Sequence, residues 1–177
     1  MTQALLPDEL VSLARRVIDE NRAAGRRIAV AESCTGGLVS AALTEIPGSS
    51  DVFDAGFVTY ADEAKVAMLG IAQDVVDTFG AVSFATAWAM ARGAVTKSGS
   101  DVAVAITGIA GPGGGSERKP VGTVVFACAR AGDDPDHAVT DIRHFGDIGR
   151  GGIRLQAALC ALSMLLPEAD ETGAATP

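Results

Sequence analysis

The segment 31–37 reads Ala-Glu-Ser-Cys-Thr-Gly-Gly and places two nucleophilic side chains, Ser33 and Cys34, next to each other. Apolar residues at 28–30 precede it and predict a buried strand, and those at 38–43 follow it and predict a helix. Backbone N–H groups at the start of a helix lack internal partners and can hold an anion. The segment therefore predicts a catalytic nucleophile at a strand-to-helix turn, and either side chain could serve.

A second candidate segment, 107–116, is rich in glycine and follows the apolar run at 102–106. In an open α/β sheet, ligands collect outside the carboxyl ends of the strands. Glycines permit a close backbone approach and a concave cluster of N–H donors suited to phosphate or an oxyanion. The segment matches neither common nucleotide-binding glycine pattern, so a flexible surface loop is the alternative.

Tyr60, the only tyrosine, ends a third strand-like run, and Lys65 follows inside a helical segment. A lysine acts as a general base only where desolvation or a cationic neighbour lowers the pKa of its amine from about 10.4. At a glycine-lined site such an amine could deprotonate a serine. The alternative is that Lys65 pairs with Asp62 or Glu63 on a solvated helix face while Tyr60 packs at a sheet edge.

Histidine and metal chemistry have little support in the sequence. His137 and His144 are the only histidines and have no obvious orienting carboxylate, which disfavours a Ser-His-Asp triad. The spacing of Cys, His and acidic residues matches no metal site, so we expect none. A cysteine nucleophile would need a His or Glu partner, and only Glu32 is adjacent to Cys34. Cys128 and Cys160 lie in apolar runs and are expected to pack in the core.

The composition indicates a single globular domain. The 177 residues are 48% hydrophobic and carry a formal charge of −8. We expect one domain over 1–167 and a flexible tail over 168–177. The acidic balance disfavours nucleic-acid and anionic membrane partners. No signal peptide or membrane-spanning run is visible, and three widely spaced cysteines favour a reducing, cytoplasmic location.

Strands and helices alternate along the chain, which predicts a layered α/β domain. The apolar runs at 28–32 and 102–106 predict central strands, and two successive strands near the C-terminus predict an antiparallel hairpin, so the sheet should be mixed. Strands are expected at 28–32, 56–60, 102–106, 121–129 and 138–145. Helices are expected at 8–24, 36–46, 62–69, 73–79, 83–98 and 150–166.

Six motifs in a fixed order resemble the C-terminal domain family of the competence/damage-inducible protein CinA, over about residues 8 to 166. Its stand-alone members are nicotinamide-nucleotide amidohydrolases. The motifs are the segment at 31–37, Pro-Gly-Ser-Ser at 47–50, Val-Thr-Tyr at 58–60 with Lys65, Gly-Ala-Val-Ser at 80–83, Thr-Gly-Ile-Ala-Gly-Pro at 107–112 and Lys-Pro-Val-Gly at 119–122.

The resemblance implies an α/β fold, a three-layer α/β/α sandwich with a mixed, mostly parallel central sheet. It implies hydrolysis of the carboxamide of nicotinamide mononucleotide, a small-molecule nucleotide substrate, without metal or cofactor. Ser33 would be the nucleophile, Lys65 its activating base and Tyr60 a helper in proton transfer or positioning. It also implies a tendency to form homodimers. A non-catalytic nucleotide-binding module of the same fold is the alternative.

The remaining site residues are expected to bind the substrate. Backbone N–H groups of Thr35, Gly36 and Gly37 would hold the oxyanion. The first candidate for holding the phosphate is Thr107 with its glycine loop, and the second is the pair of serines after Pro47. Arg150 would supply positive charge. The full set is Thr35, Gly36, Gly37, Ser49, Ser50, Thr107, Gly108, Gly111, Gly113, Gly114 and Arg150.

The chain departs from the family pattern at three places. Two residues are inserted before Arg150, Phe84 replaces a usual acidic residue, and Asp62 stands where Asn is common. Each departure adjoins a candidate site segment, so each bears on substrate preference or activity.

Overall fold

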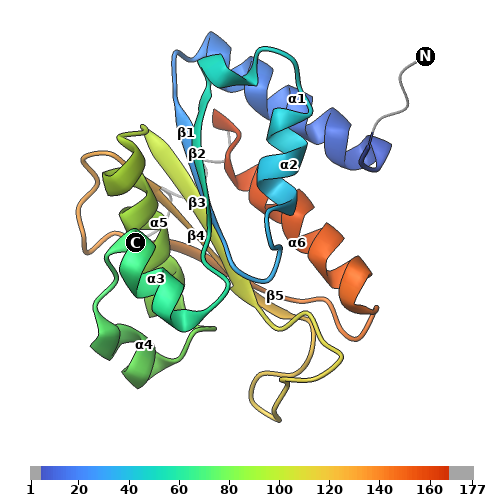
Figure 1. The fold of residues 1–177 in the computed structure, drawn as a ribbon, viewed down its shortest axis with the longest axis vertical. Coiled ribbons are helices and arrows are strands. Elements are labelled where there is room, and N and C mark those ends of the chain that lie inside the picture. Colours follow the sequence, from blue (N-terminus) through green and yellow to red (C-terminus); the bar gives the residue numbers. More distant parts are fainter. Residues whose placement is uncertain (1–4, 168–177) are drawn as a thin grey trace, which may run out of the picture.

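A five-stranded sheet forms the centre of the computed structural model, which describes residues 5–167 (Figure 1). The strand order is β2-β1-β3-β4-β5. Strand β1 pairs in parallel with β2 and β3, whereas β4 is antiparallel to both of its neighbours, so only β4 opposes the common direction. The predicted mixed sheet and C-terminal hairpin are confirmed. The strands are β1 Ile28–Glu32, β2 Phe53–Val58, β3 Val102–Gly108, β4 Thr123–Arg130 and β5 Val139–His144.

Helices cover both faces of the sheet, which confirms the three-layer α/β/α architecture (Figure 1). One face is covered by α1 Asp8–Ala23, α2 Leu38–Thr44 and α6 Arg150–Met164, and the other by α3 Asp62–Leu69, α4 Gln73–Phe79 and α5 Phe84–Ser98. A short 3-10 helix, Ser49–Asp51, precedes β2. Among the described helices, none combines the length and the apolar character needed to cross a bilayer.

Strands β1 and β3 are buried along nearly their whole length, as expected for central strands covered on both faces. Side chains of β1 and β3 contribute to two apolar clusters, one beneath α1, α2 and α6 and one beneath α5. The core thus holds β1, β2 and β3 side by side, and their carboxyl ends meet at one edge of the sheet. The predicted tail at 168–177 lies outside the described residues.

Several element boundaries differ from the sequence expectation by one to three residues, and two of the starts have a clear physical reason. Helix α2 starts at Leu38 rather than at 36, because Gly36 and Gly37 have φ angles of +59° and +94°, which a right-handed helix does not contain. Strand β2 starts at Phe53 rather than at 56. Its early part contains Asp54, whose carboxylate accepts hydrogen bonds from Arg27 and from Ser100 Oγ, so the charge concealed the strand pattern.

Candidate active site

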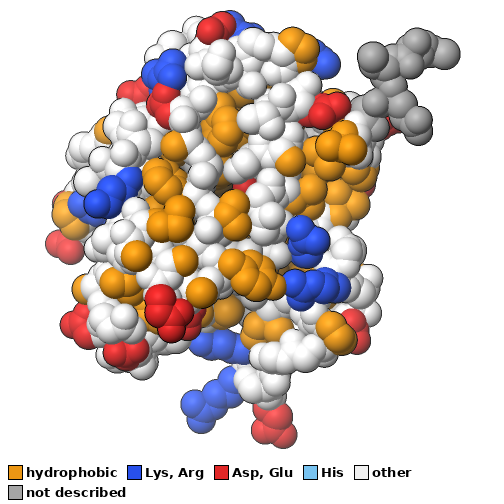
Figure 2. Space-filling view, in the orientation of Figure 1, with side chains coloured by type: hydrophobic (Ala, Val, Ile, Leu, Met, Phe, Trp, Pro, Cys, Tyr) orange, Lys and Arg blue, Asp and Glu red, His pale blue; other side chains and the backbone are white. Residues whose placement is uncertain are grey.

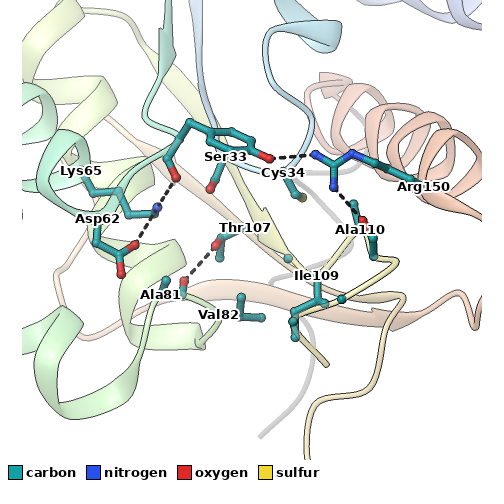
Figure 3. Close-up of a pocket in the computed structure, with 15 residues that line it drawn as sticks. Ser33, Cys34, Asp62, Lys65, Ala81, Val82, Thr107, Ile109, Ala110 and Arg150 are labelled. Carbon is teal, nitrogen blue, oxygen red and sulfur yellow. Dashed lines mark hydrogen bonds and ion pairs between the residues drawn. The ribbon is translucent and has the colours of Figure 1, made fainter. Parts of the chain in front are cut away.

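A cavity of about 270 Å³ lies at the edge where β1, β2 and β3 end (Figure 3). Its volume is just below the range of about 300 to 1,000 Å³ typical of small-molecule sites. Most of the predicted site residues line it: Ser33, Tyr60, Lys65, Thr107, Gly108, Gly111, Gly113, Gly114 and Arg150. It is also lined by Cys34, Asp62, Ala81, Val82, Ile109 and Ala110. The strand order therefore brings three separate candidate segments to one cavity.

Ser33 follows the last residue of β1, and its backbone N–H donates to Ile106 O at 2.9 Å, which continues the pairing with β3. Its side chain is 8% exposed and points into the cavity (Figure 3). The Ser33 hydroxyl has no hydrogen-bond partner within the described part of the chain. It is therefore free to contact a substrate or a base.

Lys65 reaches the same cavity from α3 and is only 1% exposed. Its ammonium donates to Asp62 Oδ1 at 3.1 Å and, over a long 3.5 Å, to Tyr60 O. The expected pairing with Asp62 is present, but the burial excludes a solvated helix face. An ammonium has three N–H donors, so one remains available to the cavity. Lys65 is thus a buried cation paired with a half-exposed carboxylate.

Arg150 and Tyr60 close the opposite side of the cavity. Arg150 Nη2 donates to Tyr60 Oη at 2.7 Å, and Nη1 donates to Gly111 O at 2.8 Å (Figure 3). The two inserted residues before Arg150 therefore do not remove it from the site. Because a guanidinium has five N–H donors, Arg150 can bind an anionic group while it bridges these two walls.

The expected oxyanion donors are only partly available. Gly36 N donates to Ser33 O at 3.0 Å, and Gly37 N donates to the Glu32 carboxylate at 3.1 Å. These two N–H groups are therefore occupied, and neither glycine lines the cavity. On the same turn, the N–H groups of Cys34 and Thr35 donate to no carbonyl or carboxylate of the described residues. Cys34 lines the cavity, so its N–H replaces those of the glycines as the candidate oxyanion donor, whereas Thr35 is fully buried and does not line the cavity.

Cys34 lines the cavity beside Ser33 but is poorly suited to attack a carbonyl. Burial raises the pKa of its thiol to about 12, with a smaller contribution from the Glu32 carboxylate. The backbone N–H of Cys34 and the guanidinium groups of Arg154 and Arg150 oppose this rise without cancelling it. Because the thiolate is the reactive form, Cys34 stays unreactive near neutral pH.

A wall of the cavity formed by Ala81 and Val82 was not anticipated as a contact surface. Thr107 Oγ1 donates to Ala81 O at 2.8 Å, and Lys119 Nζ donates to Val82 O at 2.6 Å. The Thr107 hydroxyl proton is therefore already used, and the side chain can only accept a further hydrogen bond. The motif at 80–83 was the sequence feature that could have identified this wall. Its residues contribute to the wall through their backbone carbonyls, which a sequence pattern does not show. Phe84 follows this motif, is 47% exposed and does not line the cavity.

Ser49 and Ser50 lie outside this cavity. They form part of the 3-10 helix that precedes β2, whereas the cavity is at the carboxyl end of that strand. A six-residue strand spans about 20 Å, so the two serines lie at the opposite edge of the sheet. The expectation that they hold the phosphate of a substrate bound at Ser33 does not fit this placement.

Comparison with known proteins agrees with this architecture. A family model described as the CinA C-terminal domain matches residues 10–169. The chain belongs to this family. A putative competence-damage inducible protein of Symbiobacterium thermophilum is 52% identical over 147 residues, which are 80% of this chain and 34% of that protein. A CinA-like protein of Mycobacterium avium is 60% identical over 104 residues, which are 59% of this chain and 24% of that protein.

Solved CinA-family structures share the fold. A competence/damage inducible protein of Agrobacterium tumefaciens has a TM-score of 0.87 at 49% identity, covering 92% of this chain and 97% of that one. A CinA superfamily protein of Escherichia coli has a TM-score of 0.80 at 32% identity, covering 93% and 94%. The chain thus matches these structures almost end to end, but it spans only about a quarter to a third of the two curated relatives above.

The charge distribution of this CinA-family domain is uneven. The net charge is −8, yet Figure 2 shows Lys and Arg side chains over the N-terminal end of α6 and the loop after β3. Within the cavity, Lys65 and Arg150 provide two cations against the single carboxylate of Asp62. The site therefore suits an anionic ligand on an otherwise acidic protein.

Proposed function

We propose that the chain hydrolyses the carboxamide of nicotinamide mononucleotide to nicotinate mononucleotide and ammonia. The observation that carries the proposal is the convergence of three groups on one cavity: an unpartnered serine hydroxyl, a buried lysine amine and an arginine. Ser33 supplies a nucleophile, Lys65 a proton acceptor and Arg150 a cation for the substrate phosphate. Gly113 and Gly114 line the cavity, so their N–H groups are candidate phosphate donors.

In the first step, Ser33 Oγ attacks the carboxamide carbon while Lys65, acting as the neutral amine, takes the hydroxyl proton. The carbonyl oxygen becomes an oxyanion and accepts a hydrogen bond from the N–H group of Cys34. Tyr60, through its hydroxyl contact with Arg150, positions the guanidinium for the phosphate.

In the second step, the carbon–nitrogen bond breaks and ammonia leaves with the proton returned by Lys65. A water molecule then attacks the acyl-serine, and Lys65 takes one of its protons. Collapse of that intermediate breaks the bond from carbon to Ser33 Oγ, and Lys65 returns its proton to Oγ, which releases nicotinate mononucleotide and regenerates the Ser33 hydroxyl. The cycle consumes one water and needs no group that the chain lacks.

A non-catalytic nucleotide-binding module is the second candidate, and one observation favours it. Lys65 Nζ lies 3.1 Å from Asp62 Oδ1, and a lysine held as an ammonium in this ion pair cannot accept a proton. A domain that keeps this ion pair in the bound state would bind the nucleotide without hydrolysing it.

The test is to incubate the purified chain with nicotinamide mononucleotide and follow nicotinate mononucleotide and ammonia by mass spectrometry and an ammonia assay. The proposal expects turnover in the wild type and in Cys34→Ala, and loss of turnover in Ser33→Ala. Binding of the nucleotide by calorimetry without turnover would support the non-catalytic module. Retained turnover in Ser33→Ala would refute the serine mechanism.

A further inference from the structure

Glu32 ends β1 directly before the proposed nucleophile, and its side chain is completely buried. A carboxylate removed from water is costly unless it accepts hydrogen bonds from the protein. This one accepts four. Oε2 accepts from Gly37 N and Val39 N, each at 3.1 Å, and Oε1 accepts from Ser40 N at 2.8 Å and Ser40 Oγ at 2.7 Å.

The donors are the backbone N–H groups at the start of α2, which would otherwise have no partner. The carboxylate thus takes the place that an anionic ligand often occupies at a helix N-terminus. Its side chain reaches eight residues along the chain, from the end of β1 to Ser40. The turn that carries Ser33 lies between Glu32 and Ser40. The hydrogen bonds of the Glu32 side chain therefore hold the two ends of this turn together, in addition to the backbone pairing.

Arg154 holds the same turn from α6. Its Nη2 donates to Thr35 O at 2.8 Å, and the turn is crossed internally by the bond from Gly36 N to Ser33 O. With Glu32 on one side and Arg154 on the other, the backbone has little freedom to rotate. Glu32 also occupies the N–H of Gly37, which leaves that of Cys34, a residue of the cavity wall, as the donor beside the reacting atom.

We propose that Glu32 is a positioning residue for the reaction at Ser33: its buried carboxylate sets the orientation of the Ser33 hydroxyl and of the N–H donor beside it. This inference rests on the proposed amidohydrolase function. Glu32 does not reach the cavity and takes no proton from the substrate. Its loss should therefore lower the rate of the chemical step more than the affinity for the nucleotide.

The decisive variant is Glu32→Gln, which keeps the shape but turns an N–H₂ group toward N–H donors. Misplacement of a reacting group by about 1 Å can cost about 100-fold in rate, so we expect kcat for nicotinamide mononucleotide to fall about 10- to 100-fold, with KM within about threefold of the wild type. A kcat within about twofold of the wild type in folded Glu32→Gln would overturn the inference while leaving the function in place.

Ser40→Ala is the second variant, in case Glu32→Gln does not fold. It removes one of the four hydrogen bonds, and we expect a smaller fall in kcat, about three- to tenfold, with unchanged KM. Ser100→Ala is the matched control, because it deletes another buried hydroxyl-to-carboxylate bond, from Ser100 Oγ to Asp54 at 2.7 Å, at the far edge of the sheet. Equal falls in kcat for these two variants would mean a general effect on folding and would overturn the inference.

Labelling of Ser33 by a fluorophosphonate, followed by intact-protein mass spectrometry, separates the two proposals. A wild type that is labelled but does not hydrolyse nicotinamide mononucleotide would refute the function, and slower labelling in Glu32→Gln would still support positioning. A wild type that neither turns over nor is labelled at Ser33 would overturn both.

Discussion

Lys65→Met separates the role of the buried lysine in catalysis from its role in the fold. Methionine has a similar length and fills the same space without charge. If Lys65 is the base that activates Ser33, the substitution should abolish turnover without destabilising the domain. An ordinary structural ion pair would show the opposite pattern, with lost stability and retained activity.

The expected magnitudes follow from the contacts of the ammonium. Its pair with Asp62 is worth roughly 0.2 to 1 kcal/mol, because the carboxylate is half exposed and water screens the interaction. The contact with Tyr60 O is long at 3.5 Å and adds little. Burying an ammonium costs several kcal/mol, so Lys65→Met should be as stable as the wild type or more stable by about 1 to 3 kcal/mol. Loss of a general base should lower kcat about 10²- to 10⁴-fold.

Urea unfolding at pH 7 measures the free energy of unfolding, and steady-state hydrolysis of nicotinamide mononucleotide measures kcat. Lys97→Met, which changes an exposed lysine of α5, controls for the loss of one positive charge. A kcat within about tenfold of the wild type would refute Lys65 as the base. If Lys65→Met loses more than about 1 kcal/mol of unfolding free energy, the ion pair with Asp62 stabilises the fold more than stated above.

Arg150→Ala should raise KM for the nucleotide about 10- to 100-fold, which corresponds to the loss of one hydrogen bond to a charged group. Arg92→Ala, on the outer surface of α5, is the control and should leave KM unchanged. If steady-state assays give the same KM for Arg150→Ala and for the wild type, Arg150 does not bind the phosphate. For Cys34, the pKa near 12 predicts that alkylation by iodoacetamide accelerates about tenfold per pH unit from pH 7 to 10, because the thiolate fraction grows in proportion. A plateau in that rate below pH 10, read by mass spectrometry, would show a lower pKa. Thr59 has a fully buried hydroxyl with no partner among the described residues. Thr59→Val should therefore leave the free energy of unfolding, measured by urea titration, unchanged or raise it by up to about 1 kcal/mol. A clear fall in that free energy would mean that the hydroxyl makes a hydrogen bond.

Most elements of the fold were predictable from local pattern. The apolar runs at 28–32 and 102–106 predicted central strands, and the structure places β1 and β3 there, because only strands covered on both faces read as continuous apolar runs. The predicted start of β2 was three residues too late, because Asp54 interrupts the apolar pattern of the strand. The charge of Asp54 is satisfied by hydrogen bonds from Arg27 and Ser100, which are remote in sequence. A strand start that depends on such partners cannot be read locally.

The candidate site was predictable in its chemistry more than in its contacts. Ser33, Lys65 and the glycine segment were identified by residue type at strand ends, and parallel strands bring such ends together. The hydrogen bonds of Glu32 were not foreseen, because a lone acidic residue after an apolar strand has no signature before its burial is known. The serines at 49 and 50 were assigned to the same ligand, but they precede β2 and lie at the opposite edge.

By itself, the sequence determined the order and type of the elements, the available nucleophiles and the family, because these depend on local periodicity and on residue identity. The tertiary structure alone decided that Lys65 is buried beside Asp62, that Glu32 occupies the first N–H groups of α2, and that the thiol of Cys34 is too desolvated to ionise readily. Those properties come from burial and from hydrogen bonds between distant segments. They exist only once the sheet has brought the segments together.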